Sequence, residues 1–142
     1  MSDASNMKIL FEKGLNEYEK GDYFEAHEAW EDLWSDYNFP DRKFIQGLIQ
    51  LSVSFVHLSN GNMIGARNLL KKCEEKFSDY KGIHRQININ ELKFEISKLI
   101  KDKEKIKTMA NTAYIVINNI PDPSTILLNK IKPYLKGSGE QL

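Results

Sequence analysis

The sequence has 142 residues, of which 41% are hydrophobic and 28% are charged, and its 20 basic and 20 acidic residues give a net charge of zero. A chain of this size can bury a sufficient core without a metal ion or a disulfide, and its single cysteine, Cys73, excludes an intramolecular disulfide. It shows neither a signal-peptide pattern nor an apolar run long enough to cross a membrane, so we expect a cytoplasmic protein with no membrane partner.

The predicted helices follow one another along most of the chain, because apolar residues recur at helical spacing between cap residues and glycines. A first helix is predicted after a cap at Ser5 or Asn6, and Gly21 ends it. Asp22 is expected to cap the second helix. In chain order, the later helices are predicted at about residues 23–37, 42–60 and 63–78, and from residue 88 or 90 onward.

The predicted third helix is apolar around most of its circumference, which is typical of the central helix of a bundle. Ile9 and Phe94 are assigned to the apolar faces of the first and the last helix. The turn at residues 19–26 is reminiscent of a tetratricopeptide repeat. Residues 61–66 are only weakly similar to that turn, so a solenoid is not expected.

These elements predict an all-α, single-domain bundle of five or six helices with a tetratricopeptide-like hairpin at its N-terminus. Residues 1–107 are assigned to the bundle. Residues 108–142 are expected to form an extended or short-helical extension packed on the bundle, with frayed last residues.

The charge is unevenly distributed along these elements. Residues 1–41 contain 3 Lys or Arg and 11 Asp or Glu, a net charge of −8, whereas residues 81–142 contain 11 and 6, a net charge of +5. We expect the acidic first helices to pack near the basic C-terminal helix, and segregated charge can also steer a partner. A pI of about 6.8 argues against nucleic acid as that partner.

Polar side chains interrupt the apolar faces of the second and third helices. The second helix carries His27, Glu31 and Trp34 on one face, and the third carries a stripe of Gln46, Gln50, Ser54 and His57. The short loop between these helices makes them antiparallel neighbours, so the two stripes are expected to face each other across a narrow, Trp-walled slot.

Three interpretations of this slot remain open. The side chains could form a buried network that fixes the helix register, or they could bind an unknown small molecule or a protein segment. A metal-dependent or acid–base hydrolase is the third, with His27 as base or ligand and Glu31 as its partner. Residues 27–31 lack the second histidine of the zinc-protease motif, and His57 is a weak third ligand, so no metal and no cofactor is predicted.

Three other residue groups have simpler interpretations. Cys73 is expected to be a small core residue of the fourth helix. His84 is expected at the surface of a turn. A homodimer is a further alternative, in which the aromatic face of Trp30, Trp34 and Tyr37 is buried between two copies.

The motif residues together resemble a bacterial and archaeal family known as domain of unknown function 309, over about residues 8–100. The segments that carry the resemblance are Phe24–Glu28 with Glu31 and Trp34, then Gln46–Gln50, then Gly61–Asn62, Gly65–Ala66 and Leu69–Leu70. The resemblance implies an all-α bundle and no particular activity. Because its motif also includes Glu28, the predicted binding slot consists of His27, Glu28, Glu31, Trp34, Gln46, Gln50 and His57.

Overall fold

Five α-helices and one short β-hairpin follow each other along residues 2–101, the part of the chain that this computed structural model describes. The elements are α1 (Asp3–Glu19), α2 (Tyr23–Asp36), α3 (Arg42–Ser59), α4 (Met63–Phe77), β1 (Ile83–His84), β2 (Ile87–Asn88) and α5 (Ile89–Lys101). The predicted all-α fold is thereby confirmed, whereas the expected extension at residues 108–142 lies outside the described residues. No helix among residues 2–101 is both long and apolar enough to cross a membrane.

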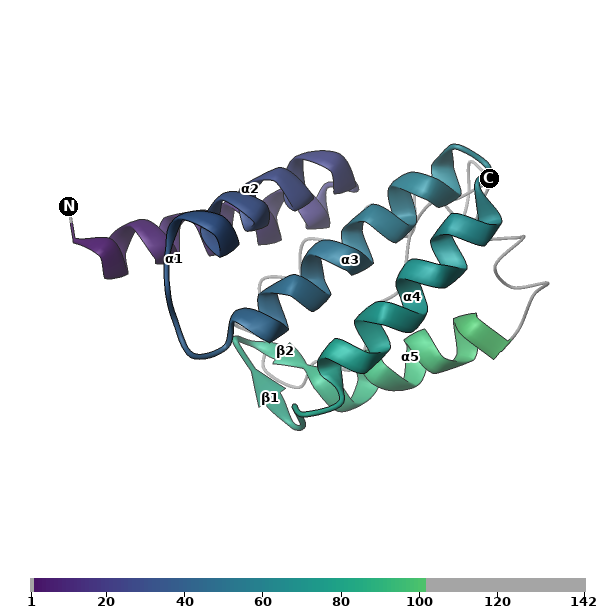
Figure 1. Cartoon of the computed structure of the whole chain (residues 1–142). Helices are drawn as coiled ribbons and strands as arrows, with labels where there is room; N and C mark the ends of the chain where they lie inside the picture. The colour runs from purple at the N-terminus through teal and green to yellow at the C-terminus, as the bar shows by residue number, and fades with distance from the viewer. Residues whose placement is uncertain (1, 102–142) are drawn as a thin grey trace.

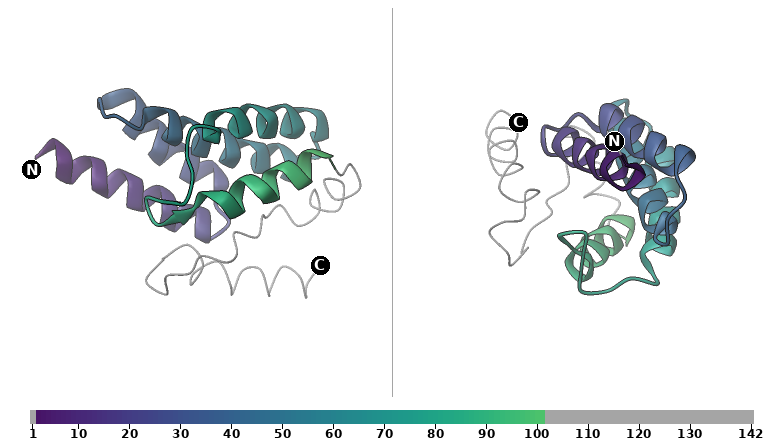
Figure 2. Two further views of the ribbon diagram at one scale, coloured as in Figure 1. Left: turned by 90° about the horizontal axis from the view of Figure 1, so that it is seen from below. Right: turned by 90° about the vertical axis from the view of Figure 1, so that its left-hand side faces the viewer.

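Successive helices are neighbours in space, and α3 lies between α2 and α4 (Figure 1). This position explains why α3 is apolar nearly all round, since it buries side chains against both neighbours. Its fully buried residues include Phe44, Ile45, Leu51, Phe55 and Leu58. The last helix, α5, packs against α4 after the β-hairpin reverses the chain (Figure 2).

The α1–α2 hairpin is repeated by α3–α4 at an interval of 40 residues. Gly21 and Gly61 both have positive φ, +81° and +76°. The side chains of Asp22 and Asn62 then cap the next helix, accepting from the N–H groups of Glu25 (3.3 Å) and Gly65 (2.9 Å). Buried positions correspond as well: Leu15 with Phe55, Tyr18 with Leu58, Ala26 with Ala66, Trp30 with Leu70 and Leu33 with Cys73.

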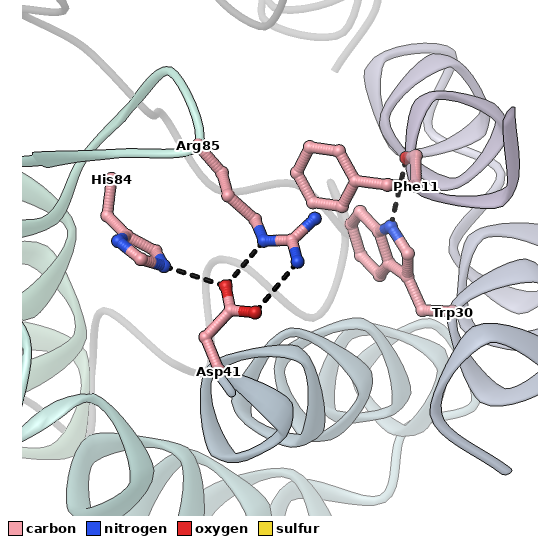
Figure 3. Close-up of polar contacts among 5 residues, drawn as sticks. All are labelled: Phe11, Trp30, Asp41, His84 and Arg85. Carbon is pink, nitrogen blue, oxygen red and sulfur yellow. Dashed lines mark hydrogen bonds and ion pairs between the residues drawn. The ribbon is translucent and has the colours of Figure 1, made fainter. Parts of the chain in front are cut away.

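The first hairpin is held together by Trp30, which is only 1% exposed. Its indole N–H donates to the carbonyl oxygen of Phe11 at 3.1 Å (Figure 3). A Cβ atom placed on Gly14 would lie 2.1 Å from the same indole nitrogen. The missing side chain at Gly14 therefore lets α1 and α2 approach closely enough to bury the tryptophan.

Three details of the helices differ from the sequence-based expectation. The first helix begins at Asp3, because the Ser2 hydroxyl caps it by accepting from the Ser5 N–H. Ile9 and Phe94 are 50% and 59% exposed instead of facing the core. Each of these two helices packs mainly on one neighbour, α1 on α2 and α5 on α4, so only part of its apolar surface is buried. Helical spacing alone does not show which apolar residues belong to that part.

We expect the Gly14→Ala variant to unfold more easily than the wild type by about 2 kcal/mol, because the added methyl group overpacks the Trp30 contact. In an ordinary helix interior the same change stabilises by up to about 1 kcal/mol. Chemical denaturation measures the difference, with the exposed neighbour substitution Lys13→Ala as control. A Gly14→Ala protein as stable as the control variant would contradict this packing.

Candidate functional site

A pocket of about 230 Å³ lies between α2 and α3, at the end of α2 that leads into the connecting loop. Its lining comprises Glu31, Trp34 and Ser35 from α2 and Gln46, Ile49 and Gln50 from α3. The structure thus brings Glu31, Trp34, Gln46 and Gln50 of the predicted slot together at one pocket.

The pocket combines a tryptophan wall with hydrogen-bond acceptors. The Oε1 atom of Gln50 is buried and has no hydrogen-bond partner among the described residues, whereas the Glu31 carboxylate is 54% exposed. The Arg42 guanidinium lies 4.3 Å from the centre of the Trp34 ring and donates to the Trp34 carbonyl oxygen at 2.8 Å. The Arg42 contacts hold the Trp34 ring in place, and the Gln50 Oε1 atom beside it stays without a partner among the described residues.

His27 does not line this pocket, but it contacts Glu31, which does. The Nδ1 atom of His27 lies 2.8 Å from the carbonyl oxygen of Phe24, and the Nε2 atom lies 3.3 Å from Glu31. The Glu28 carboxylate is farther from Nε2, at 3.9 Å. The imidazole ring therefore lies between two acceptors, the Phe24 carbonyl oxygen and the Glu31 carboxylate.

His57 lies apart from the pocket, near the end of α3, where its Nδ1 atom is 3.3 Å from the side-chain nitrogen of Asn62. Ser54 is buried and donates to the Leu51 carbonyl oxygen of its own helix. No group of three or more His, Cys, Asp or Glu side chains within residues 2–101 is placed to hold a metal ion.

Two other sequence-based expectations concern the core. Cys73 is fully buried as expected, and burial raises the pKa of its thiol. Trp30 is buried within its own chain, so it is not available to the aromatic dimer face that was considered above.

A second polar cluster, which was not predicted from the sequence, joins the start of α3 to the β-hairpin. Asp41 immediately precedes α3, but its side chain makes no capping hydrogen bond. Its carboxylate instead accepts from His84 Nε2 at 2.8 Å, from Arg85 Nε, and from Arg85 Nη2 at 2.8 Å (Figure 3). His84 was expected at the surface of a turn; its side chain is 32% exposed beside the hairpin turn, but it also takes part in this cluster.

Aromatic rings surround this cluster on both sides. The His84 ring packs edge-on against Phe44, with centroids 4.6 Å apart. The Arg85 guanidinium lies 4.7 Å from the centre of the Phe11 ring and 5.7 Å from that of Phe39. The ion pair therefore connects α1, the α2–α3 loop and the hairpin in one contact.

The hairpin has an unusual turn. His84 pairs with Ile87, which leaves Arg85 and Gln86 as its two-residue loop. Both have positive φ, +48° and +68°, as a type I′ turn requires, although Asn and Gly are the residues that suit such a turn. Holding other residues there costs roughly 1–2 kcal/mol each. Ile83 and Ile87 on either side of the turn were the available sequence signal, but without Asn-Gly this signal is weak.

The acid–base state of Asp41 follows from its partners. Burial raises the pKa of its carboxyl, but hydrogen bonds from Arg85 and His84 and the adjacent positive charge outweigh burial and hold the pKa below its ordinary value. The ionised form is thus favoured by folding. The ionised Asp41 carboxylate contributes fully to the free energy of unfolding above its unfolded-state pKa of about 4. This contribution is lost as the pH falls through the folded-state pKa, which is lower.

We expect Asp41→Asn to reduce the free energy of unfolding at pH 7 by about 1–2 kcal/mol, because the Arg85 guanidinium and the His84 ring lose an ionised acceptor. Between pH 5 and pH 2 the variant is expected to lose less stability than the wild type. Denaturant titrations across this range measure both effects.

The matched control is Asp79→Asn, which removes a carboxyl whose pKa is also lowered, by Lys43, but which lies at the surface. Exposed pairs contribute little, so the control is expected to follow the wild type. Equal effects of the two substitutions would contradict the role assigned to Asp41.

Comparison with known proteins adds one finding. The model of the family described as "Domain of unknown function (DUF309)" matches residues 11–69, a segment that contains the whole α2–α3 pocket. No curated protein and no solved structure matches the chain. The matching family is the one that the sequence motifs resemble, so the predicted resemblance is confirmed over residues 11–69.

Proposed function

We propose that this protein is a non-enzymatic binding module whose α2–α3 pocket holds an ammonium group, carried by a small molecule or by a lysine side chain of a protein partner. One observation carries the proposal: the buried Oε1 atom of Gln50 has no hydrogen-bond partner among the described residues and lies in a pocket that Glu31 also lines. A buried acceptor without a donor is destabilising, and a bound N–H group would satisfy it.

The charge of the site supports a cation as the ligand. Glu31 supplies a carboxylate at the rim, and residues 1–41, the part of the sequence that includes α1 and α2, carry the net charge of −8. An ammonium group has three donors and could bond both acceptors while its methylene stem lies along Trp34. The volume of about 230 Å³ suits a group of the size of a lysine side chain.

The alternative of a register-fixing network has less support. Such a network needs hydrogen bonds among its members. Within residues 2–101, no side-chain hydrogen bond joins Glu31, Gln46 or Gln50 to one another, and Ser35 donates to the Glu31 carbonyl of its own helix.

The test is a titration of the ¹⁵N-labelled full chain with n-butylammonium and with Nα-acetyl-lysine methylamide, followed by amide chemical shifts. We expect saturable shifts around the pocket and at least tenfold weaker binding in Gln50→Met and in Glu31→Gln. Glu28→Gln is the matched control, because Glu28 is a neighbouring exposed carboxylate that does not line the pocket. It is expected to bind like the wild type.

Stability separates the proposal from the structural alternative. In Gln50→Met an apolar chain of similar length replaces the unpartnered amide, so the free energy of unfolding is expected to stay the same or to rise by up to about 1 kcal/mol. A loss of more than about 2 kcal/mol, together with no binding of either probe by the wild type, would show that Gln50 has a structural role.

An acid–base hydrolase is a second candidate, favoured by the 3.3 Å contact between His27 and Glu31 at the pocket rim. In that case His27 is the base and Glu31 orients it. Hydrolysis of a small-ester panel by the wild type, abolished in His27→Ala, would support this function. Turnover that is absent, or unchanged in His27→Ala, would contradict it.

A further inference from the structure

A second, larger pocket of about 380 Å³ lies between α1, the α2–α3 loop and the tip of the hairpin. We propose that it binds a small monocarboxylate with an apolar body, either a free acid or the C-terminal residue of a peptide. Apolar side chains that include Met7, Phe11, Leu15 and Phe39 form much of its lining, and Lys8 and Arg85 supply positive charge. This site is separate from the α2–α3 pocket and does not depend on the function proposed there.

Arg85 is held in place at this pocket before any ligand arrives. Its Nε and Nη2 atoms donate to Asp41, and the Phe11 ring lies within cation–π distance of the guanidinium (Figure 3). The Phe39 ring lies within this distance as well. The third nitrogen, Nη1, has no hydrogen-bond acceptor among the described residues. A guanidinium fixed in this way can offer an N–H group to a carboxylate with little loss of side-chain entropy.

The backbone of the hairpin places this guanidinium at the pocket. Arg85 and Gln86, the two residues with unfavourable positive φ, are also the two hairpin residues that line the pocket. Glycine would fit such a turn without strain but would supply neither side chain. Strained backbone of this kind is concentrated at ligand-binding sites.

The charges at the pocket favour one carboxylate over other ligands. The position over the Phe11 ring that a cationic ligand would take is already filled by Arg85. Lys8 has no ion-pair partner among residues 2–101, so it is a second group available to an anion. Two carboxylates, Glu12 and Asp41, also line the pocket, and that of Asp41 already accepts from His84 and Arg85. Glu12 disfavours a dianion, although it can accept from the ammonium group of a zwitterionic ligand.

Calorimetric titration of the full chain with 3-phenylpropionate and with its uncharged isostere 3-phenylpropanamide tests the proposal. We expect 3-phenylpropionate to bind at least tenfold more tightly than 3-phenylpropanamide. In NMR spectra of the full chain, the acid is expected to shift the backbone N–H signals of Phe11 and Gln86. Equal binding of acid and amide would overturn the proposal by showing an apolar pocket only. Binding of neither the acid nor the peptide probe described next would overturn it as well.

Two further arms identify the source of the carboxylate and the contribution of Lys8. A Gly-Gly-Phe peptide with a free C-terminus is compared with its C-terminal amide. Tighter binding of the free peptide than of 3-phenylpropionate supports a peptide ligand, and the reverse supports a free acid.

Lys8→Gln is expected to weaken acid binding by about three- to tenfold. Lys13→Gln, on the same helix but outside the pocket, is the control, and equal effects of the two substitutions would contradict the assignment of Lys8.

Discussion

The contact between Trp30 and Gly14 is the constraint on which both pockets depend. The indole fills the space left by the missing side chain of Gly14 and donates to Phe11, so it fixes α2 against α1. Because α2 cannot rotate once Trp30 is buried, Glu31 and Trp34 are directed to the side where α3 lies. The same contact fixes the segment of α1 that carries Phe11, which lines the second pocket.

Asp41 makes the second long-range connection. Its partners His84 and Arg85 are more than 40 residues away in the sequence, and together they attach the hairpin to the loop between α2 and α3. Without this ion pair, nothing in the short two-residue strands would hold the turn in its strained conformation. The bundle and the hairpin thus form one structure, with a pocket on each side of the α2–α3 loop.

The helices were predictable because each has a local signal, such as the Asp22 cap or the apolar circumference of α3. The grouping of Glu31 and Trp34 with Gln46 and Gln50 followed from helical spacing and one short loop. His57 does not line the α2–α3 pocket, because 11 residues of helix separate it from Gln46 by roughly 16 Å along the axis. The internal repeat was barely visible in the sequence, since the large core residues differ, as Trp30 and Leu70 do, and besides the burial pattern little more than the turn glycine and the cap is kept. The Asp41 cluster depends on tertiary contacts that no local pattern encodes.

The central claim is that Glu31 and Gln50 act together on a ligand and not on the fold. A double-mutant cycle of Glu31→Gln and Gln50→Met tests it most directly, measured once as the free energy of unfolding without ligand and once as the free energy of ammonium binding. The account predicts additive effects on unfolding, within about 0.5 kcal/mol, and clear non-additivity in binding. A coupling above about 1 kcal/mol in unfolding, with none in binding, would contradict it.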